Sequence, residues 1–212
     1  MMKLSLLCLF KILSLTILTS LLTMAQPKEW GSPDPAHLEM KTPMVDKNAD
    51  AEVLLWEVYI NDSSRYVTTY THFLRIKIFT DRGKETQSRI DIPYLDINSV
   101  SEIAGRTIKP DGSVVELRKE SIFDREIVKY QKLKVRAKSF AMPGIETGSI
   151  IEYRWREARP ESPYYVKLEL QREIPVQTVR YYLKPFADTY PMRTITFTLQ
   201  GNRTPFAENT QR

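Results

Sequence analysis

Short segments in which apolar and polar residues alternate follow one another along most of the chain after residue 50. Two of the clearest are residues 132–138 and residues 149–156. In an extended strand, successive side chains point to opposite faces, so a period of two predicts strands buried on one face. In the second segment Ile151, Tyr153 and Trp155 share one face, and Glu152, Arg154 and Arg156 share the other. Helical spacing is hard to find in this region, so the fold class is expected to be all-β.

The spacing of turn-forming residues favours an antiparallel β-sandwich of about ten short strands. Turns are expected at Asp81-Arg82-Gly83 and at Pro110-Asp111-Gly112, where glycine accepts a positive φ without steric cost. Pro93 is expected to end the third strand, and the start of the fourth is also compatible with a helical turn. The expected ranges are 51–60, 65–80, 87–92, 99–109, 113–117, 132–138, 149–156, 165–173, 176–183 and 193–199.

The first 25 residues have the pattern of a secretory signal peptide. Lys3 precedes a mostly apolar run, and beyond Lys11 the uninterrupted apolar stretch has the length of a signal-peptide core. Export to the periplasm or the cell exterior is therefore expected. The alternative is an uncleaved membrane anchor, which requires Lys11 to lie within the membrane. The remaining chain divides into an extended Pro-rich leader (26–44), the β-sandwich domain (45–200) and a polar tail or truncated linker (201–212).

Composition argues against several kinds of site. Cys8 is the only cysteine, and His37 and His72 are the only histidines, so neither a Cys–His nucleophile pair nor a Cys- or His-rich metal site is expected. Removing Lys3 and Lys11 with the signal peptide leaves 31 − 2 = 29 basic residues against 26 acidic ones. That balance does not predict nucleic-acid binding. The sequence also lacks the nucleophile elbow of serine hydrolases and a phosphate-binding loop. No cofactor is expected.

A basic stripe is the first candidate binding surface. Lys132, Lys134, Arg136 and Lys138 alternate with apolar residues along one expected strand. They could bind a polyanion such as an acidic polysaccharide. The alternative is a solvated outer strand face, on which lysines also discourage edge-to-edge aggregation.

Tyrosines of the C-terminal third are the second candidate. Tyr164, Tyr165, Tyr181, Tyr182 and Tyr190 crowd this region. Alternation predicts that one tyrosine of each adjacent pair faces the core. The outward ones could bind a sugar or a neighbouring domain.

Carboxylates are the third candidate. A carboxylate-based hydrolase needs two acids on opposite sides of its substrate. Asp91 and Asp96 flank Pro93, and Glu146 and Glu152 flank a Gly-rich loop. The alternative is that these acids are solvated or cap turns, and Asp91 and Glu146 are the two to test by substitution. A single histidine in a strand, such as His72, is more often structural than catalytic.

Six blocks of sequence, in this order, resemble a bacterial domain of unknown function found N-terminal to transglutaminase-like domains. The blocks are residues 50–55, 75–83, 92–94, 104–113, 140–153 and 171–176. The resemblance implies an exported, all-β, non-catalytic domain, with the Cys–His–Asp chemistry in the following transglutaminase-like domain. This chain holds no candidate for that cysteine, so no catalytic residue carries over. It is expected to be a fragment of a longer product or a standalone copy.

The motif positions of these blocks are mostly turn formers and therefore explain a fold rather than a site. They are Gly83, Pro93, Pro110, Asp111, Gly112, Pro143, Gly144 and Gly148. The sequence thus favours an accessory module that presents a substrate or partner to a transglutaminase-like domain. The alternatives are a standalone carbohydrate- or polyanion-binding envelope protein and a carboxylate-based hydrolase. Contact with the membrane is expected only through the signal peptide.

Overall fold

The structure is a computed structural model that describes residues 30–31, 34–64, 66–130, 133–160 and 168–184. The chain divides into two compact units, residues 1–34 and 35–212, and every assigned element lies in the second. The elements are α2 (Pro35–Glu39), β1 (Ala51–Asn61), β2 (Thr68–Ile78), α3 (Asp81–Gln87), β3 (Arg89–Leu95), β4 (Ser99–Ile108), β5 (Val114–Glu116), the 3-10 turn η1 (Lys119–Ser121), β6 (Phe123–Tyr130), β7 (Leu133–Ala141), β8 (Ile150–Arg159) and β9 (Val179–Lys184). No helix in the described residues is long and apolar enough to cross a membrane.

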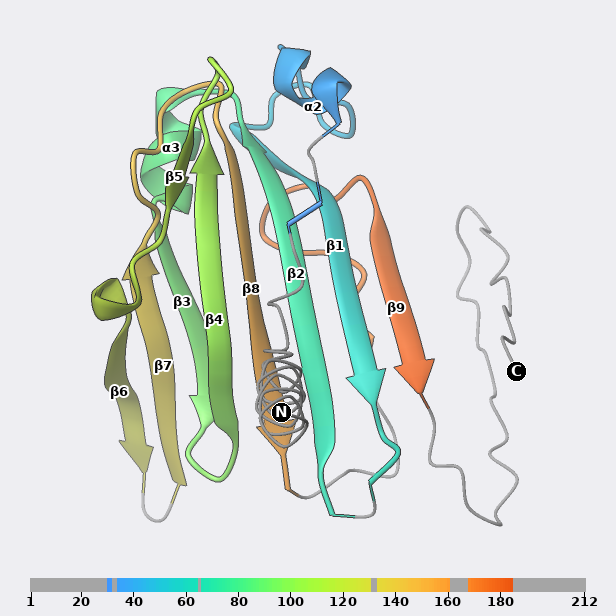
Figure 1. Cartoon of the computed structure of the whole chain (residues 1–212), viewed down its shortest axis with the longest axis vertical. Helices are drawn as coiled ribbons and strands as arrows, with labels where there is room; N and C mark the ends of the chain where they lie inside the picture. The colour runs from blue at the N-terminus through green and yellow to red at the C-terminus, as the bar shows by residue number, and fades with distance from the viewer. Residues whose placement is uncertain (1–29, 32–33, 65, 131–132, 161–167, 185–212) are drawn as a thin grey trace, which may run out of the picture. The chain divides into compact units, whose positions relative to one another are not determined.

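Two sheets confirm the expected all-β sandwich (Figure 1). A six-stranded sheet has the order β5-β4-β8-β2-β1-β9, and a three-stranded sheet has the order β3-β7-β6. All strand pairs are antiparallel except β1 and β9, which run parallel. The purely antiparallel arrangement was therefore wrong at this edge. A parallel partner needs a long crossover, and residues 160–178 provide one between β8 and β9.

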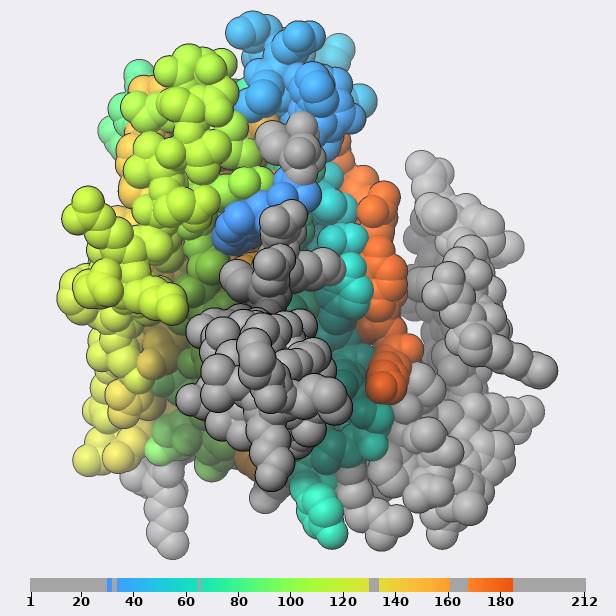
Figure 2. All heavy atoms as spheres, in the orientation of Figure 1, coloured from blue at the N-terminus to red at the C-terminus, as the bar shows by residue number. Residues whose placement is uncertain are grey.

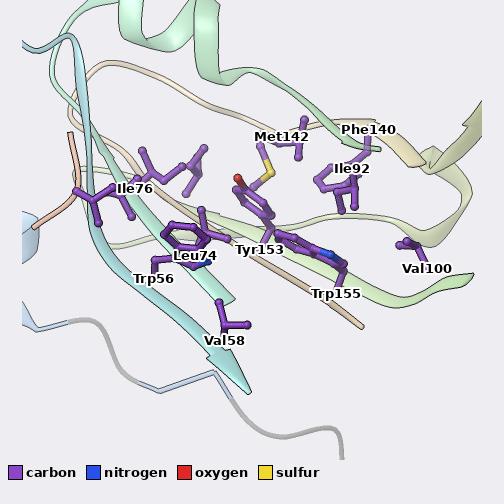
Figure 3. Close-up of a cluster of buried hydrophobic side chains, with 14 of the residues drawn as sticks. Trp56, Val58, Leu74, Ile76, Ile92, Val100, Phe140, Met142, Tyr153 and Trp155 are labelled. Carbon is purple, nitrogen blue, oxygen red and sulfur yellow. The ribbon is translucent and has the colours of Figure 1, made fainter. Parts of the chain in front are cut away.

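The core lies between the two sheets (Figure 3). The Phe140 ring of β7 meets the Tyr153 ring of β8 edge-on, with 6.1 Å between centroids. The six-stranded sheet contributes Trp56, Val58, Leu74, Ile76, Val100, Tyr153 and Trp155, and the other side contributes Ile90, Ile92, Phe140 and Met142. The face expected to be apolar in residues 149–156 is thus confirmed as the core face.

Three strand predictions differ from the structure. β3 continues through Pro93, which an edge strand tolerates because β7 is its one partner among the described strands. β6 was missed, because its charged residues interrupt the apolar alternation. The expected strand 165–173 is absent from its described part, residues 168–173, and the strand 193–199 lies outside the described residues.

Of the two expected glycine turns, one is confirmed and one is corrected. Gly112 holds a positive φ of 83°, and the motif residue Gly144 also holds a positive φ, of 61°. The expected turn at residues 81–83 is instead the first turn of α3, whose N-cap is Thr80. Gly83 has no positive φ, so glycine is present there for another reason.

Candidate functional site

The basic stripe points toward the core side of the three-stranded sheet. In the register of β3 and β7, Arg136 lies opposite Tyr94 and Lys138 lies opposite Ile92. Directly opposite residues share a face, and Tyr94 and Ile92 belong to the core. The prediction of a solvated outer face was therefore wrong for the described part of the stripe. Lys132 lies outside the described residues.

Asp124 of β6 partly neutralises the stripe. Its carboxylate accepts hydrogen bonds from Arg136 Nε at 3.1 Å, Lys138 Nζ at 2.9 Å and the Tyr94 hydroxyl at 2.9 Å. Burial alone would raise the pKa of Asp124, but the bonds from Lys138, Arg136 and Tyr94 outweigh it and lower that pKa to about 2. Arg136 and Lys138 thus hold an internal carboxylate, which weakens the case for a polyanion site.

The candidate acid Asp91 belongs to a second polar cluster, on the opposite face of the same sheet. Ser139 Oγ donates to Asp91 Oδ1 at 2.5 Å, and Arg125 Nη2 donates to Oδ2 at 2.8 Å. Arg125 Nε also donates to Ser139 Oγ at 2.9 Å. Burial would raise the pKa of Asp91, but Ser139 and Arg125 lower it overall. An ionised carboxylate of lowered pKa is a poor general acid and a weak general base.

Glu146, the other candidate acid, lies in the loop before β8. Its side chain is about half exposed, and Lys109 Nζ is 3.9 Å from its carboxylate. No hydrogen bond or ion pair joins Glu146 to Asp91 in the described part of the chain. The structure therefore does not assemble these two acids into one site.

The tyrosine pair of β9 divides as predicted. Tyr181 packs against the core, 6.0 Å from the Trp56 ring. Tyr182 is 41% exposed and stacks on Tyr59 of β1, with 4.4 Å between centroids. The Tyr182 hydroxyl donates to Glu57 at 3.0 Å. Tyr164, Tyr165 and Tyr190 lie outside the described residues.

The candidate acid Glu152 is the centre of a buried ion triad, an arrangement that sequence reasoning did not predict. Glu152 of β8 lies opposite Arg75 of β2 on one side and opposite Arg106 of β4 on the other. Arg75 Nε and Arg106 Nε each donate to a different carboxylate oxygen of Glu152, both at 2.6 Å. Glu152 is fully buried. Alternation correctly placed Glu152 on the non-core face, but gave no signal that this face would be covered.

Two further buried charged residues lie opposite each other in the same sheet, Glu52 of β1 and Lys77 of β2. Lys77 Nζ donates to the carbonyl oxygens of Leu38 at 2.9 Å and Gly148 at 2.6 Å. Glu52 accepts hydrogen bonds from the amides of Met44 and Val45 and from Gln177 Nε2. Burial lowers the pKa of the Lys77 ammonium. The pair thus holds residues 38–45 and the chain before β9 against the sheet, which is a structural role.

His72 of β2 is packed inside the sandwich, as expected for a structural histidine. Its ring is parallel to Trp155, with 4.3 Å between centroids. Both ring nitrogens are buried, and neither has a hydrogen-bond partner among the residues that the structure describes. Burial, reinforced by Arg159 and Arg172, lowers the pKa of His72 to about 4. The folded protein therefore needs this ring to be neutral.

We expect acid to destabilise the protein through His72. On unfolding, the pKa of His72 rises to the ordinary histidine value of about 6.5. The stability that the neutral His72 ring contributes is therefore complete above that pH and is lost as the pH falls toward 4. At pH 4 the free energy of unfolding is expected to be about 2–3 kcal/mol lower than at neutral pH. In this range, stacking of the protonated His72 ring on Trp155 offsets about 1 kcal/mol of the cost of burying its charge. Urea unfolding of His72→Phe between pH 7 and 4.5 should show a smaller loss than the native chain. The matched control is His37→Phe, and an equal loss in native chain and His72→Phe would contradict the assignment.

Comparison with known proteins places this fold in a family. The model of DUF3857, a domain of unknown function with solved structures, matches residues 64–210. The chain belongs to the DUF3857 family. This confirms the resemblance drawn from the six sequence blocks, although the matched region begins after β1. The motif residues of DUF3857 in this chain serve turns and packing: Gly144 and Gly148 hold positive φ, and Pro93 lies in an edge strand.

Among solved structures, this DUF3857 chain is similar in fold to a "putative protease" from Parabacteroides distasonis. The two are 19% identical with a TM-score of 0.51, over 63% of this chain and 28% of the other. The chain thus spans less than a third of that protein. A CBM3a-L domain from a Clostridium thermocellum scaffoldin is 13% identical over 56% of this chain and 71% of its own, at a TM-score of only 0.32. No curated protein matches the sequence.

Proposed function

We propose that this DUF3857 domain is a non-catalytic module that serves a transglutaminase-like catalytic domain by holding or presenting its substrate or partner. Family membership carries the proposal, together with the fold likeness to a minor part of the larger Parabacteroides protein. The catalytic residues would then belong to the transglutaminase-like domain, and this domain would hold or present the substrate or partner.

The state of the acids supports this assignment. Asp91 and Asp124 both have a lowered pKa, and Glu152 is enclosed between two guanidinium groups. A general acid must keep its proton near neutral pH, so the lowered pKa values of Asp91 and Asp124 oppose that role. In each case the ion pairs join different strands of one sheet, which is what a structural carboxylate does.

The module is further proposed to work outside the cytoplasm, after cleavage of the first 25 residues. The support is the apolar run beyond Lys11 and the small residue Ala25 before the expected cleavage point. N-terminal sequencing of the protein from its native host should begin at Gln26. A mature protein that still begins at Met1 would contradict cleavage and favour an anchor.

The proposal is tested by combining the purified chain with a transglutaminase-like domain from the same envelope. The chain alone should not cleave peptides or glycans. Added to the catalytic domain, it should bind and raise kcat/KM on protein substrates. Hydrolysis by the chain alone that disappears in Asp91→Asn or Glu146→Gln would overturn the proposal in favour of a carboxylate-based hydrolase.

A standalone carbohydrate-binding protein is the second candidate, because the partly exposed Tyr182 presents an aromatic ring beside a carboxylate. Aromatic faces with adjacent polar groups suit sugar binding. A glycan array should lose binding in Tyr182→Ala if this site is used. Lys134→Glu tests the stripe without disturbing Asp124, whereas Arg136→Glu would place a second carboxylate beside it.

A further inference from the structure

Strand β6 leaves an apolar edge uncovered. It is an end strand of the three-stranded sheet, with β7 as its one partner in the described residues. Phe123 is 65% exposed, Ile127 42% and Val128 50%. In the space-filling view the yellow-green atoms of β6 lie at the left margin, with no described segment over them (Figure 2). An uncapped edge with exposed apolar side chains is a template for pairing with another strand.

The sequence of this edge is complementary to itself. Read antiparallel to a second copy, Glu126-Ile127-Val128-Lys129 places each glutamate opposite a lysine and each isoleucine opposite a valine. Glu126 and Lys129 are both exposed, and no ion pair involves either of them in the described part of the chain. The neighbouring charges Asp124 and Arg125 are engaged within the sheet.

A β-bulge makes this complementarity geometrically possible. The register of β6 and β7 shifts between Glu126, opposite Arg136, and Val128, opposite Val135; Lys129 then lies opposite Lys134. Residues 134 and 136 share a face of β7, so Glu126 and Lys129 also share a face. In a regular strand, residues three apart point to opposite faces and could not meet across a two-fold axis. With the bulge, Glu126 of one copy and Lys129 of the other lie on the same side of the joined sheet.

We propose that two copies of this chain associate through β6, antiparallel about a two-fold axis between Ile127 and Val128. The two three-stranded sheets would then join into one. The interface is isologous, so each contact occurs twice: two Glu126–Lys129 pairs flank a central apolar contact of Ile127 with Val128. Opposite charges directly across antiparallel strands stabilise the pair, and like charges destabilise it.

Charge reversal tests the proposal on the purified full chain. Analytical ultracentrifugation over a micromolar concentration series should show a reversible monomer–dimer equilibrium for the native protein. Glu126→Lys and Lys129→Glu should each weaken association about tenfold or more, since each creates two like-charge contacts. The double variant should recover dimerisation, and an equimolar mixture of the two single variants should form mixed dimers. Lys47→Glu, an exposed charge reversal outside the sheets, is the control and should leave association unchanged.

Each alternative result overturns the proposal. A native chain that stays monomeric throughout the series has no such interface. A dimer that both single variants leave intact uses another surface, and a double variant that stays monomeric would mean that the charges do not pair across an axis. Thermal melts of every variant separate loss of pairing from loss of fold.

Discussion

Replacing Glu152 with glutamine is expected to lower the free energy of unfolding by about 3–5 kcal/mol. The carboxylate is fully buried between Arg75 and Arg106, each 2.6 Å away. Glutamine has nearly the same volume but no charge, so two largely buried guanidinium groups would lose their counter-ion. Uncompensated buried charges are far more costly than the loss of an exposed ion pair. Urea unfolding monitored by circular dichroism measures the change.

The matched control is Glu102→Gln on the same sheet. Glu102 pairs with Arg156 at 2.9 Å, but its side chain is 64% exposed. Its loss should cost no more than about 1 kcal/mol. Equal stability of the two variants would contradict a stabilising triad, and the buried charges would then need another explanation.

Much of the fold could be predicted because burial imposes a period of two on strands. Ile151, Tyr153 and Trp155 face the core as alternation predicts. Turn chemistry placed Gly112 at positive φ for a similarly local reason. Both signals depend on a few consecutive residues, and such signals can be interpreted without knowledge of the tertiary fold.

The site could not be predicted in the same way, because its properties depend on partners distant in sequence. Arg136 and Lys138 looked like a free basic surface until Asp124, in a strand missed from the sequence, was found between them. Alternation placed Glu152 on the polar face of its strand, but the two arginines that hold it come from β2 and β4. Alternation says which face a residue occupies. It does not say which strands lie beside it or whether that face is covered.

Replacing Gly83 with alanine should destabilise the protein by about 2–3 kcal/mol, although alanine is the better helix former. A Cβ atom at Gly83 would lie 2.1 Å from the carbonyl oxygen of Asp50. That oxygen cannot move freely, because the amides of Phe79 and Thr80 both donate to it. The first turn of α3 is thus pressed against the start of β1, and glycine is needed for close approach rather than for its φ angle.

Thermal melts of Gly83→Ala and of Glu85→Ala, an exposed position in the same helix, separate the two effects. Helix propensity alone predicts that Gly83→Ala stabilises the protein by about 1 kcal/mol and so raises its melting temperature. On the same ground Glu85→Ala should change the melting temperature little. The close contact predicts a clear decrease for Gly83→Ala alone. A rise would mean that α3 does not pack on Asp50, and Gly83 would then be an ordinary helical position. A decrease would show that the glycine of the Asp-Arg-Gly motif is needed for the close approach of α3 to Asp50, and not for a turn.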